Sequence, residues 1–347
     1  MTPDLVHSIR RQCPRAGGIV AVMVAFLLPV GLQAKTIRIS GSSTVYPITR
    51  DAIAAFRRTP RGRAVRFDLQ ETGSSAGLRE FCSGRMPMVN ASRPISSSEL
   101  QRCEASGVRF IELPIAFDAI SIVVNPANTW AERISTAQLR RLWSKPAQGR
   151  INQWQQVNSA WPARPIALCG PGKDSGTFDI FNKAINGSKA NSRTDYLASE
   201  DDSQLVRCVA NNVNALGYFG FGYYRSNARD LKALAVVGPE GAVPPSVQNV
   251  QKERYLPLSR PLFLYLNAEA VKQEASLRRF VSFYVRNGLK IVKASNYVPL
   301  PSSTYALVEQ KFYRQILGTS FGGDLPVGLT IGAALDRSFD QHKRPGF

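Results

Sequence analysis

Histidine is scarce in this chain, and its scarcity argues against several kinds of enzyme. Only two histidines occur among the 347 residues, and only His342 would remain after removal of an N-terminal targeting segment. A serine hydrolase needs a base positioned against its nucleophile, and zinc enzymes commonly use neutral imidazole as a ligand. One histidine close to the C-terminus supplies neither chemistry well. We therefore predict a protein that is not an enzyme and that uses no metal and no cofactor.

Long basic runs are also missing, although the formal net charge is +19. Lys and Arg never occur in runs longer than two, and no helix suited to reading a nucleic acid is recognisable. Scattered positive charge produces a general field that attracts small anions. We therefore expect no nucleic-acid partner.

Residues 1–34 have the composition of a cleaved secretory signal. Three arginines precede the apolar stretch 18–28, and Ala34 is a small residue at the expected cleavage point. Pro29 and Gly31 end the apolar stretch before it is long enough to span a membrane comfortably; an uncleaved anchor is the alternative. Cleavage removes three Arg and one Asp from 44 basic and 25 acidic residues, which leaves a net charge of +17.

Four cysteines would remain in the exported chain, and an even number in that setting indicates two disulfides. They are Cys82, Cys103, Cys169 and Cys208. Of the three possible connectivities we favour the sequential one, Cys82–Cys103 and Cys169–Cys208. No Cys-x-x-Cys pair occurs, so neither a zinc knuckle nor a redox pair is indicated.

Three segments share the pattern of a short apolar strand, a Gly/Ser/Thr turn and an amphipathic helix. The free N–H groups and the positive end of a helix dipole make such a helix start suitable for an anion. In an open α/β sheet these turns gather at the carboxyl ends of the strands, where ligands bind. An ordinary capped helix start is the alternative for any one turn alone. The three turns are Gly41-Ser-Ser-Thr44, Gly73-Ser-Ser-Ala-Gly77 and Gly170-Pro-Gly-Lys-Asp-Ser-Gly-Thr177.

Two charged residues lie in apolar surroundings that favour a binding role. Arg93 follows a short strand and precedes a proline that fixes an extended geometry, so we expect it to clamp an oxyanion with its planar fork. Asp118 lies inside the long apolar run 110–125 and needs a partner there. It could be satisfied by the backbone, or it could accept a proton from a ligand. Asp201 and Asp202 are expected to serve the start of a helix, with ligand contact as the alternative.

The turn Gly73-Ser-Ser-Ala-Gly77 also matches the Gly-x-Ser-x-Gly nucleophile elbow of serine hydrolases, in the strand–turn–helix setting that the motif requires. Ser75 would be the nucleophile. The shortage of histidine makes this an alternative of low weight.

Taken in order, these segments resemble a periplasmic phosphate-binding protein of the PstS type, the solute receptor of a phosphate ABC importer. The resemblance covers about residues 36–323, and its motifs are specific in combination, although each alone is weak. They are Gly41-Ser-Ser-Thr-Val-Tyr-Pro47, Gly73-Ser-Ser-Ala-Gly77, Asn90-Ala-Ser-Arg-Pro-Ile95, Asp174-Ser-Gly-Thr-Phe178, Gly217-Tyr-Phe-Gly220 and Val298-Pro-Leu-Pro301.

The resemblance implies an α/β fold of the type II periplasmic binding protein class, with two lobes, two hinge crossings and a ligand cleft between the lobes. We expect the signal peptide at residues 1–34, the first lobe at 35–117 and 256–347 (including a C-terminal tail), and the second lobe at 118–255. The implied partners are inorganic phosphate and an ABC permease in the inner membrane. The implied protein is a periplasmic monomer.

The resemblance also implies a phosphate-binding set made of the three turns. It comprises Ser43, Thr44, Val45, Ser74, Ser75, Ser175, Gly176 and Thr177. Well-known enterobacterial-type members have an Asp where this chain has Arg93 and an Arg where it has Pro171. We therefore expect Arg93 to replace the missing clamp and Asp118 to accept the phosphate proton. The alternative is a binding protein for sulfate, molybdate or arsenate, or one with a sensing or scaffold role.

Overall fold

The longest strand, β4 (Phe110–Val124), connects the two parts of the main sheet. All fifteen of its residues are buried, as expected for an apolar run covered on both faces. In the computed structural model, which describes residues 36–238, 241–328 and 331–340, β4 pairs antiparallel with β12 (Ser259–Asn267) along residues 110–119 and with β8 (Ala215–Gly220) along residues 120–124. The strand therefore belongs to both lobes of the fold.

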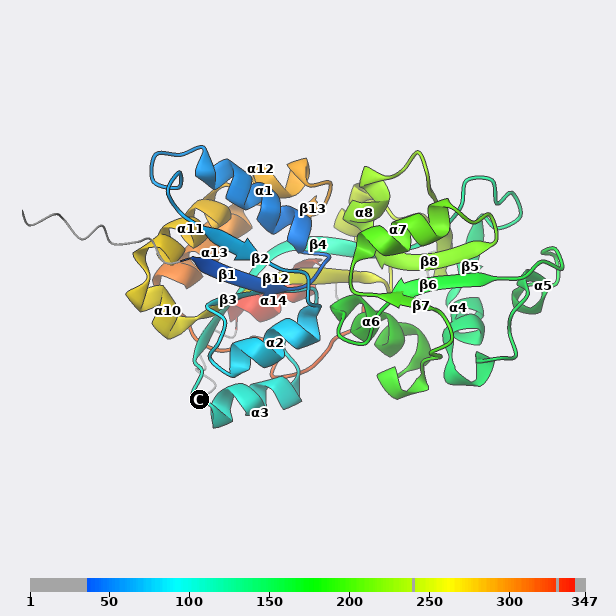
Figure 1. Cartoon of the computed structure of the whole chain (residues 1–347), viewed down its shortest axis with the longest axis horizontal. Helices are drawn as coiled ribbons and strands as arrows, with labels where there is room; N and C mark the ends of the chain where they lie inside the picture. Colours follow the sequence, from blue (N-terminus) through cyan, green and yellow to red (C-terminus); the bar gives the residue numbers. More distant parts are fainter. Residues whose placement is uncertain (1–35, 239–240, 329–330, 341–347) are drawn as a thin grey trace, which may run out of the picture. The chain divides into compact units, whose positions relative to one another are not determined.

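The first lobe contains the strand order β2-β1-β3-β12-β4. β1, β2 and β3 run parallel, whereas β12 runs antiparallel to both of its neighbours. Figure 1 shows α1, α11 and α12 on one side of this sheet and α2 and α3 on the other. The remaining elements of this lobe are β1 (Ile37–Gly41), β2 (Phe67–Leu69), β3 (Met88–Ala91), β13 (Val298–Pro299), α1 (Tyr46–Arg57), α2 (Ser74–Cys82), α3 (Ser97–Ala105), α10 (Ala268–Gln273), α11 (Ala275–Arg286), α12 (Gly288–Ala294), α13 (Ser302–Tyr313) and α14 (Ile331–Asp340).

The second lobe continues the sheet in the order β4-β8-β6-β7, with α6 and α7 on opposite sides of it (Figure 1). A small sheet, β11-β10-β5, packs beside α4. The elements are β5 (Arg133–Ser135), β6 (Ala167–Pro171), β7 (Leu197–Ser199), β8, β9 (Lys232–Ala233), β10 (Ala235–Gly238), β11 (Gly241–Val243), α4 (Thr136–Trp143), α5 (Trp154–Val157), α6 (Gly176–Phe181), α7 (Asp202–Ala210), α8 (Phe221–Ser226) and α9 (Val247–Gln251).

The helix starts form where the sequence pattern predicted them. α1 has a proline in its first turn and buries Ile48, Ala52 and Phe56, in agreement with the apolar spacing. α2 buries Leu78, Phe81 and Cys82. α14 was not predicted, because the sequence after Gly322 is weakly patterned.

Both predicted disulfides are confirmed. Cys82–Cys103 joins the end of α2 to α3, and Cys169–Cys208 joins β6 to α7. Their sequence separations are 21 and 39 residues. Chain-entropy estimates for loops of these lengths give each bridge about 3–4 kcal/mol.

The type II fold is as predicted, whereas the lobe boundaries at residues 117/118 and 255/256 stay predictions. The predicted signal segment and His342 lie outside the described residues. Within the described ranges, no helix combines the length and the apolar character needed to cross a membrane.

Candidate anion-binding site

The three predicted turns meet between the two lobes. Thr44 Oγ1, from the turn before α1, lies 3.2 Å from Thr177 Oγ1, in the first turn of α6. Ser74 Oγ, at the start of α2, lies 3.2 Å from Ser92 Oγ. A Cβ atom added at Gly176 would lie 2.6 Å from Ser74 Oγ, so α6 also begins beside α2. Three helix starts far apart in the sequence thus converge, as the sequence analysis predicted.

Glycine at position 73 permits the close approach of α2 to the second lobe. Its φ of +83° is unfavourable for residues with a side chain, and a Cβ atom there would lie 2.5 Å from the Asp174 carbonyl oxygen. The Ser75 N–H donates to this carbonyl at 2.8 Å. The N–H groups of Thr44, Ser74 and Gly176 have no acceptor within the described part of the chain, so they remain available to an anion.

Arg260, which was not among the residues predicted from the sequence, is the cation of this cluster. Its side chain is 1% exposed, and Nη2 donates to Thr177 Oγ1 at 2.8 Å and to Thr44 Oγ1 at 3.2 Å. Its Nη1 is buried and has no hydrogen-bond partner among the described residues. A buried guanidinium nitrogen without an acceptor is costly, so a ligand oxygen at this point would satisfy it.

Asp118 holds Arg260 in place. The two residues lie directly opposite each other in the β4–β12 pair. Asp118 Oδ2 accepts from Arg260 Nη2 at 2.8 Å and from Nε at 3.1 Å. Asp118 Oδ1 accepts from the Phe221 N–H at 2.9 Å. Burial raises the pKa of the Asp118 carboxyl, while the Arg260 charge and these hydrogen bonds oppose the rise.

Asp202 is a second buried acid near Arg260, and no described residue donates a hydrogen bond to its carboxyl group. It is the first residue of α7 and is 1% exposed, yet neither carboxyl oxygen has a partner among the described residues. Burial raises the pKa of Asp202 well above its ordinary value, although the Arg260 charge opposes the rise. By contrast, Asp201 acts as a helix cap, as predicted, because it accepts from the Ser203 N–H at 2.8 Å.

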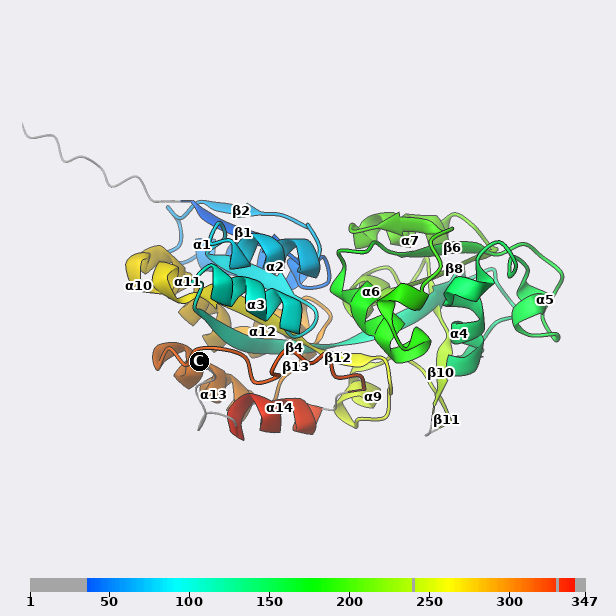
Figure 2. The ribbon, with the colours of Figure 1, turned by 90° about the horizontal axis from the view of Figure 1, so that it is seen from below.

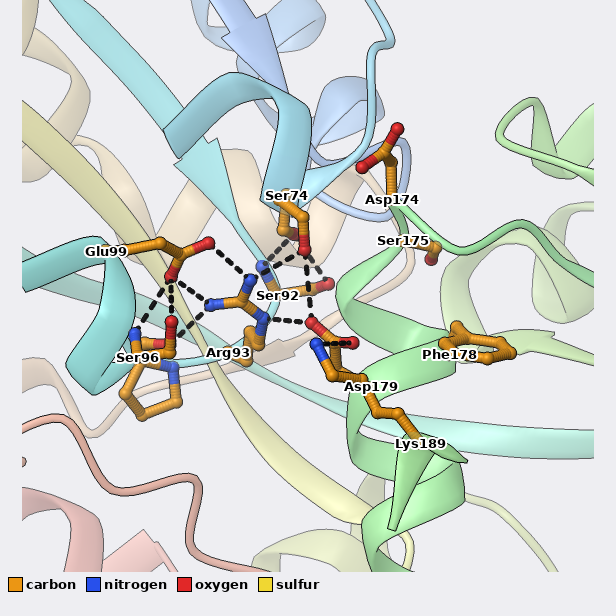
Figure 3. A network of polar contacts seen from close by, with 12 residues as sticks. Ser74, Ser92, Arg93, Ser96, Glu99, Asp174, Ser175, Phe178, Asp179 and Lys189 are labelled. Carbon is orange, nitrogen blue, oxygen red and sulfur yellow. Dashed lines mark hydrogen bonds and ion pairs between the residues drawn. The ribbon is translucent and has the colours of Figure 1, made fainter. Parts of the chain in front are cut away.

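Arg93 lies beside the site, and protein groups occupy all of its donors (Figure 3). It donates twice to the Glu99 carboxylate, each time at 2.8 Å, and its Nε donates to Asp179 Oδ2 at 2.5 Å. Ser75 Oγ and the Pro94 carbonyl accept the remaining N–H groups at 2.8 and 2.9 Å. Arg93 therefore connects the first lobe to Asp179 of α6 in the second lobe.

The acids around Arg93 complete a charged network. Burial opposes ionisation of Glu99, but the hydrogen bonds and charge of Arg93 outweigh burial and lower the pKa of Glu99. Asp179 Oδ1 also lies 2.9 Å from Lys189 Nζ. Since every donor of Arg93 is satisfied by the protein, direct contact between Arg93 and an anion stays a prediction.

The remaining predicted residues are buried around these two clusters. Ser175 Oγ accepts from the Thr177 N–H at 3.1 Å and so caps α6. Ser43, Val45 and Ser75 are at most 8% exposed. Ser75 donates to Asp179 Oδ2 at 3.2 Å and accepts from Arg93 Nη2 at 2.8 Å, and the described residues contain no histidine that could act as its base. The nucleophile-elbow interpretation is therefore not favoured.

The sequence contained a signal for Arg260. Ser-Arg-Pro occurs at residues 92–94 and again at 259–261, each time at a strand that reaches this site. The second copy lies directly opposite Asp118, but only the pairing of β12 with β4 makes this visible. The arrangement offers one guanidinium, several hydroxyl and amide donors, and two acids. That combination suits a small oxyanion that carries a proton. The described residues hold no cluster of three or more His, Cys, Asp or Glu that could bind a metal.

Comparison with known proteins agrees with this geometry. A family model described as a PBP superfamily domain matches residues 29–287. The chain is 43% identical to Protein SphX of Synechocystis over 90% of this chain and 94% of the relative. It is 30% identical to the phosphate-binding protein PstS of Staphylococcus aureus over 76% of this chain and 78% of the relative.

A solved structure of a possible phosphate binding protein from Planctomyces limnophilus has 34% identity and a TM-score of 0.60, covering 81% of this chain and 98% of that one. A putative phosphate ABC transporter substrate-binding protein from Clostridium perfringens, at 24% identity and a TM-score of 0.65, covers 77% of this chain and 100% of that one and shares the fold. The chain therefore belongs to the PstS-type family of phosphate-binding proteins within the PBP superfamily.

Proposed function

We propose that this protein binds inorganic phosphate outside the cytoplasm and delivers it to the permease of an ABC importer. The observation that carries the proposal is Arg260, whose buried guanidinium contacts Thr44 and Thr177 and keeps one nitrogen without an acceptor. A phosphate oxygen would supply that acceptor. The family membership supports the same function.

The proposed site binds the anion with neutral donors and two cations, Arg260, whose Nη1 lacks an acceptor among the described residues, and Arg93. The unpaired N–H groups of Thr44, Ser74 and Gly176 and the hydroxyls of both lobes would surround the oxygens. The proposed ligand set retains the predicted residues and adds Arg260. It comprises Ser43, Thr44, Val45, Ser74, Ser75, Arg93, Asp118, Ser175, Gly176, Thr177 and Arg260.

Two acids could accept a hydrogen bond from the proton that phosphate keeps near neutral pH. An ionised carboxylate accepts a hydrogen bond from protonated phosphate but repels sulfate, which has no proton to donate. Both oxygens of Asp118 already accept hydrogen bonds from the protein, whereas those of Asp202 accept none among the described residues. Asp118 remains the proposed acceptor because it touches Arg260 directly, and Asp202 is the next candidate.

We also propose that the anion stabilises the contact between the lobes. Thr44–Thr177, Arg93–Asp179 and Arg79–Asp174 each join a residue of the first lobe to one of the second. A phosphate bound to Thr44 and Thr177 would add further bonds of the same kind. Release to the permease would then require these contacts to open.

We further propose that residues 1–34 direct export and are then cleaved, and that the mature protein is a periplasmic monomer. The even, fully paired cysteine set supports an oxidising compartment. Mass spectrometry of the secreted protein would locate the cleavage point.

Calorimetric titration of the phosphate-stripped protein tests the binding function. Phosphate is expected to bind more tightly than sulfate, arsenate or molybdate, and equally well with and without EDTA. Tighter binding of another oxyanion would reassign the substrate, and loss of binding on chelation would show that a metal takes part.

A further inference from the structure

A cavity of about 520 Å³ lies in the first lobe between the end of α1, α11 and α13. In both ribbon views α11 and α13 lie on the far side of the first lobe from α6 and α7, which flank the anion site (Figures 1 and 2). None of the residues that line the cavity belongs to that site. Its volume is in the range of pockets that hold small organic ligands.

Four aromatic side chains form part of the wall of the cavity. Phe56 and Phe312 are only 2% and 3% exposed, Phe283 is half-buried, and Tyr313 is 56% exposed. The rings of Phe56 and Phe283 pack with their centroids 5.3 Å apart. These rings would bind the hydrocarbon part of a ligand by removing it from water.

The rim of the cavity is basic, and two of its four arginines have no hydrogen-bond or ion-pair partner among the described residues. Arg286 pairs with Glu309, and Arg278 donates to the carbonyl oxygen of Val271 at 2.8 Å. Arg61 and Arg279 are exposed, and no acid pairs with either in the described part of the chain. Both guanidinium groups thus remain free to bind an anionic group in the fork geometry that suits carboxylate and phosphate.

We propose that this cavity binds an amphipathic anion, that is, a monomeric hydrocarbon chain or ring with one carboxylate or phosphate head. The hydrocarbon part lies against Phe56, Phe283 and Phe312, and the head lies between Arg61 and Arg279. Inorganic phosphate has no apolar part to bury, so this site would not compete for the transported anion. The inference does not depend on phosphate transport.

Titration with dodecyl phosphate, below the concentration at which it forms micelles, tests the proposal. Uncharged dodecanol, which has the same chain, reports the contribution of the head. Dodecyl phosphate is expected to bind at least about tenfold more tightly than dodecanol, because its head can form charged hydrogen bonds that dodecanol lacks. Equal binding of the two, or binding of neither, would overturn the proposal.

A paired substitution tests the two free arginines. Arg61→Gln with Arg279→Gln is expected to weaken dodecyl phosphate at least about tenfold and to leave the binding of inorganic phosphate unchanged. Arg140→Gln with Arg141→Gln is the matched control, because it removes the same charge from the exposed surface of α4. If both double variants bind dodecyl phosphate equally weakly, the loss comes from the lower net charge alone and the proposed site is refuted.

Vesicles separate a free ligand from a bilayer surface. Sedimentation with vesicles of phosphatidylglycerol and with vesicles of phosphatidylcholine shows whether the arginines bind a membrane. We expect little binding to either, because a chain packed in a bilayer cannot enter the cavity. Binding to phosphatidylglycerol vesicles without binding of free dodecyl phosphate would replace the proposed ligand with a membrane.

Discussion

Replacing Arg260 by Gln should reduce both phosphate affinity and stability, by separable amounts. The change removes the charged donor beside Thr44 and Thr177 and leaves Asp118 buried without its cation. Breaking a buried ion pair costs about 3–5 kcal/mol of folding free energy. Loss of a charged hydrogen-bonding group from a desolvated site costs about 2–5 kcal/mol of binding, or about 30-fold to several thousand-fold in Kd.

Calorimetry and thermal unfolding measure the two effects separately. A ligand at a hundred times its Kd stabilises the folded state by about 2.7 kcal/mol. Wild-type protein at that phosphate concentration should therefore melt at a clearly higher temperature than phosphate-free protein. Arg260→Gln should show little of this increase at the same concentration, in addition to a lower phosphate-free melting temperature.

A double substitution decides whether Arg260 binds the anion. Arg260→Gln with Asp118→Asn removes both charges of the pair and should recover part of the lost stability. Its phosphate affinity should stay low. If the double variant binds phosphate as tightly as wild type, Arg260 serves only to neutralise Asp118 and does not bind the anion.

A control for buried arginine is available in the second lobe. Arg193 is 3% exposed and donates to both oxygens of Asp195 at 2.6 and 2.9 Å. Arg193→Gln should lower the melting temperature but leave the Kd for phosphate unchanged.

Substitutions at three further positions, 93, 118 and 71, test the neighbouring charges. Arg93→Ala should weaken phosphate binding by more than about tenfold and lower the stability of the fold. Arg93→Lys should lose much of the same affinity, because an ammonium lacks the planar fork. Calorimetry that finds wild-type affinity in Arg93→Ala would remove Arg93 from the ligand set. Asp118→Asn should narrow the phosphate-to-sulfate affinity ratio in paired titrations at one pH, and an unchanged ratio would make Asp202→Asn the next variant. Burial and then the Asp201 charge raise the pKa of Glu71 to about 7. The folded state therefore binds more protons than the unfolded state, and the free energy of unfolding should fall as pH rises from about 4.5 to about 7. Glu71→Gln should flatten the plot of melting temperature against pH in this range. A plot identical to that of wild type would show that Glu71 does not cause the pH dependence.

Local patterns explain what the sequence predicted well. The turns before α1, α2 and α6 are recognisable because glycine, hydroxyl residues and helical apolar spacing occur within about a dozen residues. β4 is recognisable as an unbroken apolar run. The disulfides followed from an even cysteine number and an export signal, and the sequential pairing matches the short distance along the chain between each pair.

Contacts between distant segments explain what the sequence could not show. Arg260 lies 142 residues from Asp118 and resembles any other arginine until β12 is paired with β4. Asp179 is a polar residue of a short helix until the second lobe brings it to Arg93, 86 residues earlier in the chain. The hydroxyl and amide donors of the site were therefore predictable from the sequence, whereas its charged residues were predictable only in part.

If the chain is exported as proposed, the position of β12 has a consequence for the order in which it folds. β12 lies between β3 and β4, yet it follows them by more than 130 residues in the sequence. A chain that emerges N-terminus first therefore holds two unpaired strand edges, on β3 and β4, until residue 267 has crossed the membrane. Unpaired edges invite aggregation.

The strands β4, β6, β7 and β8 of the second lobe all lie within residues 110–220, so their pairing does not wait for a late strand. We expect it to become protease-resistant first during translocation, with the first lobe following only when β12 arrives. Proteolysis of chains that end before Ser259 should cut within residues 36–110 and spare residues 130–235. If both parts resist digestion equally, the late strand does not control the order. Under the proposed export, this arrangement would make chaperones outside the cytoplasm most useful to the half of the protein that emerges first.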